Sequence, residues 1–192
     1  VGNPMIDTLL KHLDRFDPGP VTAQLGLEPP YGVATLHRPA NVDTPEAAAG
    51  LVRALREATA RLPIVLPLHP RGRATLAAAG LDEVPDLTVV DPLGYIEFIS
   101  LVRGAAVVIT DSGGIQEETT VLDVPCLTLR PTTERPITLT AGTNRLVAPD
   151  TLGPALDGAL AGAQARPGDG PPGWDGHAGE RVADHLLSLA RP

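Results

Sequence analysis

Residues 105–118 read AAVVITDSGGIQEE, an apolar run that leads into two glycines and then into helix-forming residues. The pattern predicts a strand over Ala106–Thr110 and a helix that opens at the glycines and ends near Leu122. The first N–H groups of a helix have no partner within it and carry partial positive charge, so they can bind a phosphate. The stretch therefore predicts an α/β fold with an anion site where a strand meets a helix.

The residues of this turn are candidate ligands. Ser112 is the expected N-cap, and Gly113 and Gly114 would let a diphosphate approach the backbone, although each glycine costs the helix about 1 kcal/mol. Glu118 lies four residues beyond Gly114 on the same helix face, where a carboxylate can accept hydrogen bonds from a ribose diol. Phosphate and ribose one turn apart describe a nucleotide. The alternatives are a simple N-cap at Ser112 and a solvated helix face at Glu118.

Further strands and helices alternate along the chain. Strands are expected at 31–36, 63–68, 87–90, 125–129 and 145–148, and helices at 6–16, 46–61, 71–79, 95–103, 152–163 and 179–190, with residues 17–20 (DPGP) ending the first helix. The strands show little polar alternation, which favours a parallel sheet covered on both faces. Right-handed crossovers then predict a doubly wound, Rossmann-like sheet of about six strands, with residues 1–192 as a single domain.

Polar residues follow several of these strands. His37 and Arg38 follow the first strand, His69 follows the second, and the 125–129 strand runs into a loop that carries Arg135. Ligands of doubly wound sheets bind at the carboxyl ends of the strands, so these side chains should face one crevice. An acidic protein that binds a diphosphate needs local cations, and arginine suits phosphate. The alternatives are a histidine that only bonds at a strand end and an arginine in a salt-bridged loop.

Composition narrows the functional classes. A net charge of −8 and a pI near 5.0 give no diffuse basic surface, which argues against nucleic acid as a partner. The single Cys126 lies in an apolar stretch and is expected to be a buried, inert thiol. The sequence has no apolar run of membrane-spanning length, and residues 1–4 lack a signal-peptide profile, so we expect a cytoplasmic protein without membrane contact.

Five short motifs follow one another along the chain: Thr35–Asn41, Pro67–Pro70, Asp111–Glu118, Thr132–Pro136 and Gly142–Asn144. In this order and spacing they resemble the non-hydrolysing UDP-N-acetylglucosamine 2-epimerases, over the carboxy-terminal half of a two-domain protein of GT-B type. The resemblance implies reversible conversion of UDP-GlcNAc to UDP-ManNAc by elimination and re-addition of UDP, within cell-envelope polysaccharide biosynthesis. It implies no nicotinamide, metal or pyridoxal cofactor.

The resemblance also implies roles for individual residues. Ser112, Gly113 and Gly114 would hold the diphosphate, and Glu118 would hold the ribose hydroxyls. The 93–98 stretch, with Tyr95 and Phe98, would lie near the uracil, and His37 would be catalytic. Arg38 and His69 would belong to a second, activating UDP-GlcNAc site. Arg135 would lie in a segment that closes the cleft.

The family's amino-terminal domain is expected to supply the acidic residues that move the C2 proton. This chain alone should therefore bind UDP or UDP-GlcNAc without turnover and should need that domain in cis or in trans; a homodimer is a further expectation. Two departures from the family pattern are Pro39-Ala40, where many relatives have Arg-Glu, and Ile137, where many have Glu. The alternatives are the donor-binding domain of a GT-B glycosyltransferase and a stand-alone nucleotide-sugar binding module.

Overall fold

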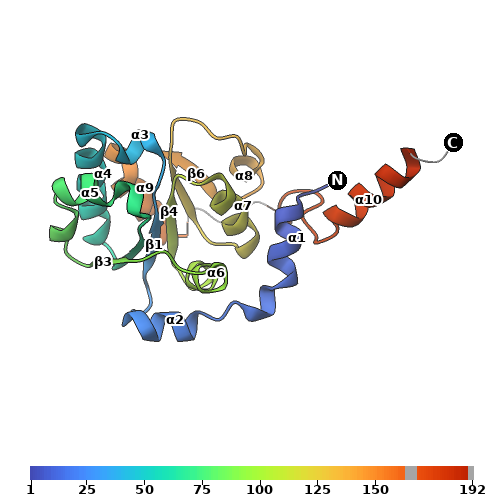
Figure 1. Ribbon diagram of the computed structural model, residues 1–192, viewed down its shortest axis with the longest axis horizontal. Coiled ribbons are helices and arrows are strands. Elements are labelled where there is room, and N and C mark those ends of the chain that lie inside the picture. Colours follow the sequence, from blue (N-terminus) through green and yellow to red (C-terminus); the bar gives the residue numbers. More distant parts are fainter. Residues whose placement is uncertain (163–167, 190–192) are drawn as a thin grey trace.

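A computed structural model describes residues 1–162 and 168–189 of the chain. Six strands form one parallel sheet in the order β3-β2-β1-β4-β5-β6 (Figure 1). The strands are β1 (Gly32–Thr35), β2 (Ile64–Pro67), β3 (Leu87–Val90), β4 (Val107–Thr110), β5 (Cys126–Leu129) and β6 (Asn144–Val147). The strand order reverses between β1 and β4, as in doubly wound nucleotide-binding folds. The predicted fold class is confirmed.

Helices cover both faces of the sheet. They are α1 (Pro4–Lys11), α2 (Pro18–Leu25), α3 (Pro39–Val42), α4 (Pro45–Thr59), α5 (Pro70–Ala78), α6 (Tyr95–Arg103), α7 (Gly113–Leu122), α8 (Ile137–Thr140), α9 (Leu152–Leu160) and α10 (Ala178–Leu189). Successive residues of a strand point to opposite faces. Ala34 accordingly joins Leu55 of α4 and Leu156 of α9 in one core cluster, whereas Val33 joins Leu101 of α6 in the other.

The amino-terminal region differs from the expectation. The predicted helix over 6–16 stops at Lys11 and continues as a short 3₁₀ turn, Leu13–Arg15. Residues 17–20, predicted to end that helix, instead begin α2. The Asp17 side chain accepts a hydrogen bond from the Gly19 N–H at 2.9 Å, and Pro18 occupies the first helical position, where its missing N–H costs nothing. An aspartate before a proline was therefore a start signal here.

Two four-residue helices, α3 and α8, were also not predicted, because single turns are too short for a periodic pattern. The sixth strand begins one residue earlier than expected, at Asn144. The predicted ends of the last two helices, at residues 163 and 190, lie outside the described residues. Cys126 is fully buried, as predicted, and burial raises the pKa of its thiol to about 11.

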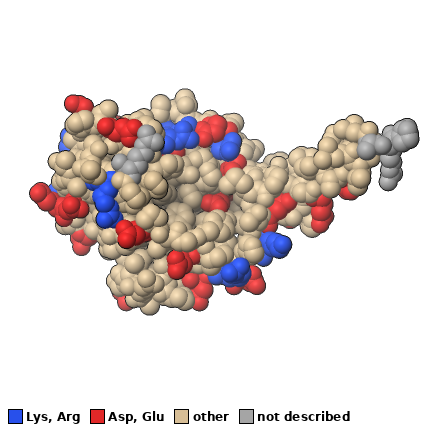
Figure 2. Space-filling model, viewed as in Figure 1, with Lys and Arg blue, Asp and Glu red and all other residues tan. Residues whose placement is uncertain are grey.

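The last helix, α10, extends away from the sheet and lies beside α1 (Figure 1). The Asp7 carboxylate of α1 accepts hydrogen bonds from the backbone N–H groups of Ala178 and Gly179 and so caps α10. Leu186 and Leu187 are exposed on this helix, whose outer part is mostly uncharged (Figure 2). Among the described residues, we find no helix that is both long enough and apolar enough to span a bilayer.

Candidate functional site

The loops after β1 and β4 meet at the point where the strand order reverses, because the two strands pair with Thr35 opposite Thr110. Asp111, the residue after β4, is fully buried. Its carboxylate accepts hydrogen bonds from the backbone N–H groups of His37 and Arg38, at 3.1 and 2.9 Å, and from the Asn41 side chain at 2.9 Å. Asp111 therefore braces this junction.

The glycine pair begins α7, as the sequence indicated. Ser112 is the N-cap residue, and its backbone N–H donates to Thr110 Oγ1 at 3.0 Å. Within the described part of the chain the Ser112 side chain makes no capping hydrogen bond, so the expected cap is not formed. Gly113 is buried and Gly114 is half-buried. The first turn of α7 therefore keeps N–H groups that the protein's own side chain does not cap.

Two arginines reach the tip of α7 from separate strands. Arg38, after β1, donates through Nε to the Asp111 carbonyl at 2.9 Å and through Nη2 to Glu134 Oε1 at 3.0 Å. Arg130, after β5, places Nη2 2.6 Å from Glu134 Oε2. The hydrogen bond from Arg130, with the charge of both arginines, lowers the pKa of Glu134 to about 2. The sequence did not single out Glu134, because the segment from 130 to 134 is irregular and no helical repeat pairs these two positions.

Arg135, a predicted ligand, pairs with a neighbour on α7. Its Nε lies 2.9 Å from Oε1 of the buried Glu117. The loop that carries it is held by Gln116, whose Oε1 accepts hydrogen bonds from the Thr133 hydroxyl at 2.5 Å and from the Asn144 amide at 3.0 Å. Gln116 is fully buried, and its role is structural. Its side chain thus fixes the arginine loop against the first turn of α7.

Glu118 and Tyr95 lie together, one on α7 and the other at the start of α6. The Tyr95 hydroxyl donates a hydrogen bond to the Glu118 carboxylate, and its ring contacts Phe16 edge-on, with centroids 6.0 Å apart. Burial, reinforced by the charge of Glu117, raises the pKa of Glu118 to about 7 despite the opposing hydrogen bond from Tyr95. The predicted ribose ligand is therefore a carboxyl group that titrates near neutral pH.

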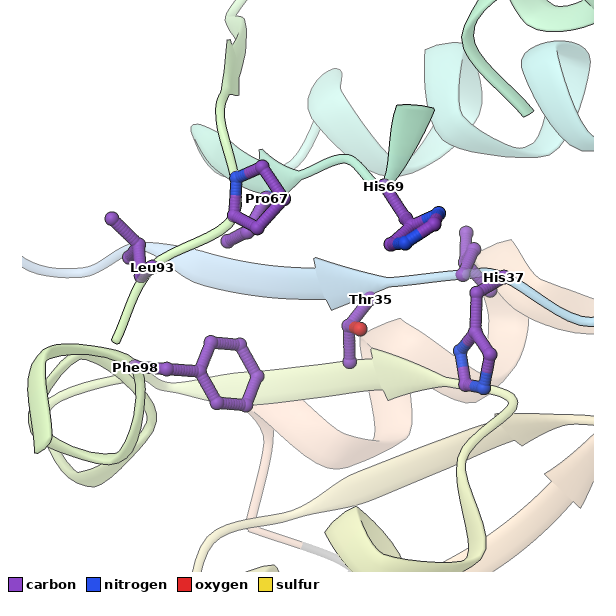
Figure 3. A pocket seen from close by; sticks show the side chains of 8 residues that line it. Thr35, His37, Pro67, His69, Leu93 and Phe98 are labelled. Carbon is purple, nitrogen blue, oxygen red and sulfur yellow. The ribbon is translucent and has the colours of Figure 1, made fainter. Parts of the chain in front are cut away.

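A pocket of about 400 Å³ opens beside this junction, at the carboxyl ends of β1 and β2. Leu93 and Phe98 lie at one end of the pocket and His37 and His69 at the other, with Thr35 between them (Figure 3). His37 connects the pocket to the tip of α7, since its Nδ1 lies 3.1 Å from Asp111 Oδ1 and its side chain is 50% exposed.

The geometry thus brings together an uncapped helix tip, two arginines and a mostly apolar pocket. A family model described as UDP-N-acetylglucosamine 2-epimerase matches residues 1–187. The chain belongs to this family. The resemblance found in the sequence is confirmed.

Several relatives of the family are similar over most of this chain. The UDP-2,3-diacetamido-2,3-dideoxy-D-glucuronate 2-epimerase of Pseudomonas aeruginosa is 37% identical, over 98% of this chain and 52% of the relative. The UDP-N-acetylglucosamine 2-epimerase of Methanococcus maripaludis is 34% identical, over 78% of this chain and 44% of the relative. The chain thus spans about half the length of these relatives.

Solved structures of the family superpose on the fold. The Methanocaldococcus jannaschii UDP-GlcNAc 2-epimerase, in complex with UDP-GlcNAc and UDP, gives a TM-score of 0.82 at 32% identity and matches 98% of this chain and 54% of its own. The Neisseria meningitidis enzyme, bound to UDP-GlcNAc, gives 0.81 at 26% identity, with 97% of this chain and 54% of its own covered. An E. coli ADP-heptose heptosyltransferase, at 15% identity and a TM-score of 0.58, shares the fold alone.

Proposed function

We propose that this chain is the UDP-binding half of a UDP-GlcNAc 2-epimerase. The observation that carries the proposal is the uncapped tip of α7, which opens at the switch point of the sheet beside Arg38 and Arg130. Backbone N–H groups and arginines are the donors that a diphosphate requires in an acidic protein. The two relatives that are solved with UDP-GlcNAc give the proposal independent support.

In the proposed complex the diphosphate lies at Ser112, Gly113 and Gly114. The uracil enters the pocket lined by Leu93 and Phe98, whose apolar surface and 400 Å³ volume suit a planar base. One turn along α7 from Gly114, Glu118 accepts the ribose hydroxyls. Ligand hydroxyls that donate to the carboxylate favour its ionised form, so binding should lower the pKa of Glu118.

Catalysis in this proposal is divided between two domains. Elimination of UDP and its re-addition leave the oxidation state of the sugar unchanged, so the route consumes no redox cofactor. It does require a base positioned at C2. His37 is the residue of this chain that we place at the sugar, because contact of Nδ1 with Asp111 leaves Nε2 as the ring nitrogen that can meet a ligand.

The carboxylates that move the C2 proton are proposed to lie in an amino-terminal domain, in cis or in trans. We place His69 near a second, activating UDP-GlcNAc site, and Arg38 between that site and the tip of α7. We place Arg135 in a segment that closes the cleft. A cytoplasmic location, a homodimer and a role in cell-envelope polysaccharide synthesis stay predictions of the same proposal.

Calorimetric titration with UDP tests the binding step. Gly114→Val should nearly abolish UDP binding because the new side chain blocks the backbone. Gly50→Val, in α4, should not, since among the described residues an added Cβ at Gly50 meets Arg53 alone, at 3.8 Å. Glu118→Gln should weaken UDP binding but leave binding of inorganic diphosphate unchanged. Unchanged UDP affinity in a folded Gly114→Val variant would contradict the proposed diphosphate site.

Exchange of the C2 hydrogen of UDP-GlcNAc with deuterated water tests the division of labour. The chain alone should show no exchange, and adding the matching amino-terminal domain should restore it, with a reduced rate in His37→Ala. Robust exchange by the chain alone would show that its own residues suffice. Sugar transfer to an added acceptor would favour a glycosyltransferase, and binding without turnover in the presence of the partner domain would favour a binding module.

A further inference from the structure

A carboxylate of the chain itself lies over the tip of α7. Glu134 belongs to the segment between β5 and α8, and its Oε1 would be only 2.7 Å from a Cβ atom added at Gly113. Arg38 Nη2 approaches the same oxygen at 3.0 Å, and Arg130 Nη2 approaches Oε2 at 2.6 Å. A negative group is therefore held between two cations at the positive end of a helix.

This arrangement has the form of a bound anion. Two guanidinium groups from different strand ends converge on one pair of oxygens, as they do on the oxygens of a phosphate. We propose that Glu134 is an internal competitor for the phosphate position: its carboxylate engages Arg38 and Arg130 until a diphosphate displaces it. This inference rests on the proposed function, since it takes the tip of α7 as the diphosphate site.

Arg38 has hydrogen bonds that do not depend on Glu134, and Arg130 is confined by burial. Arg38 Nε donates to the Asp111 carbonyl at 2.9 Å, and the Arg38 backbone N–H donates to the Asp111 carboxylate at 2.9 Å. The Arg130 side chain is only 13% exposed, and its buried Nη1 has no hydrogen-bond partner among the described residues. Both guanidinium groups therefore stay at this edge of the sheet, with donors to offer, when Glu134 moves away.

Glu134 can move without unfolding its segment. Its side chain is 42% exposed, whereas the residues around it are fixed: the Thr133 hydroxyl donates to Gln116 and the Asn144 amide donates to Thr138. Rotation of one side chain into solvent thus uncovers the site. An equilibrium of this kind lowers the apparent affinity of every ligand that uses the site, in proportion to the fraction of molecules in which Glu134 has moved away. Because partly exposed ion pairs are weak, we expect a factor of about three to ten.

Calorimetry with inorganic diphosphate, UDP and uridine tests the inference on the full chain. Glu134→Gln keeps the shape but removes the charge, and Glu134→Ala removes the competitor entirely. Both variants should bind diphosphate and UDP about three- to tenfold more tightly than the wild type, with alanine giving at least the gain of glutamine. Uridine has no phosphate, so its affinity should not change. Glu28→Gln is the matched control, because Glu28 is exposed and precedes the start of β1, whereas Arg38 and Arg130 follow the ends of their strands.

The direction of the change in diphosphate affinity decides which role Glu134 has. Weaker or unchanged diphosphate binding in variants that melt like the wild type would overturn the inference, since it would make Glu134 a support for the arginines or a bystander. If the wild type binds UDP and diphosphate but the variants bind them no more tightly, the inference is overturned and the proposed function stands. No binding of UDP or diphosphate by any variant would overturn both. An equal gain in diphosphate affinity in Glu28→Gln would show that the effect comes from the net charge of the protein. That result would also overturn the inference.

Discussion

Replacing Glu118 with glutamine should remove that carboxyl's contribution to the pH dependence of stability between about pH 4.5 and 7. Glu118 is 5% exposed and lies beside the buried Glu117. Burial first, and the charge of Glu117 second, raise its pKa from 4.5 to about 7, and the hydrogen bond from Tyr95 offsets only part of this. Glutamine copies the shape of the neutral acid and can still accept the Tyr95 hydrogen bond, but it cannot ionise.

The sign of the effect follows from proton binding in the two states. Below about pH 4.5 both the folded and the unfolded chain hold the Glu118 proton, so the carboxyl is neutral in both. Between about pH 4.5 and 7 the unfolded chain releases the proton and the folded chain retains it, so the free energy of unfolding falls as the pH rises. At about 1.4 kcal/mol per pH unit, this window removes about 3 kcal/mol from the wild type.

Urea unfolding followed by circular dichroism, at intervals from pH 4 to pH 8, measures the effect. Glu118→Gln should match the wild type within about 0.5 kcal/mol at pH 4 and exceed it by about 3 kcal/mol at pH 8. Taking the difference between the two proteins cancels the other titrating groups. A difference that stays constant with pH would refute the reasoning, and the same rise for the exposed Glu28→Gln control would show that the effect does not belong to Glu118.

Three further changes test the framework of the site by urea unfolding. Asp111→Asn puts an amide among donors that need acceptors and should lower the free energy of unfolding by about 2–4 kcal/mol. The control Asp91→Asn, at a strand-end side chain that is 90% exposed, should lower it by less than about 1 kcal/mol. Equal losses in the two variants would contradict the bracing role of Asp111. Gln116→Met should cost about 2–4 kcal/mol because the Asn144 amide loses an acceptor, and a neutral result would contradict the importance of this network. At Gly158 an added Cβ meets no atom of the described residues within 4 Å, so Gly158→Ala should stabilise α9 by about 0.5–1 kcal/mol. A loss of stability would show a clash.

Most of the fold could be predicted because local patterns and global topology agree. The apolar runs mark strands that are buried on both faces, and the alternation of strands with helices leaves few topologies for a parallel sheet. The failures are local. Residues 17–20 carry proline and glycine, which predict the end of a helix, whereas the Asp17 side chain caps α2 and Pro18 begins it.

The site could be predicted less fully, because ion pairs between loops depend on three-dimensional placement. The sequence indicated the glycine pair and the residues after each strand, since these follow from the geometry of a doubly wound sheet. It did not indicate that Glu134 engages Arg38, which is 96 residues away, or that Arg135 pairs with Glu117. Because charged side chains are long, those of one loop can form ion pairs with several different partners, and the sequence does not show which pair forms.

The structure separates the residues that build the site from those that remain open to a ligand. Asp111 and Gln116 are fully buried, and their side chains are committed to hydrogen bonds within the protein. Ser112 is half-buried and leaves the tip of α7 uncapped, so its side chain is open to a ligand. Changes in the first pair should therefore lower stability, and their effect on ligand affinity should follow from unfolding. A change at Ser112 should instead lower affinity with little loss of stability, because it removes a contact that only a ligand can make.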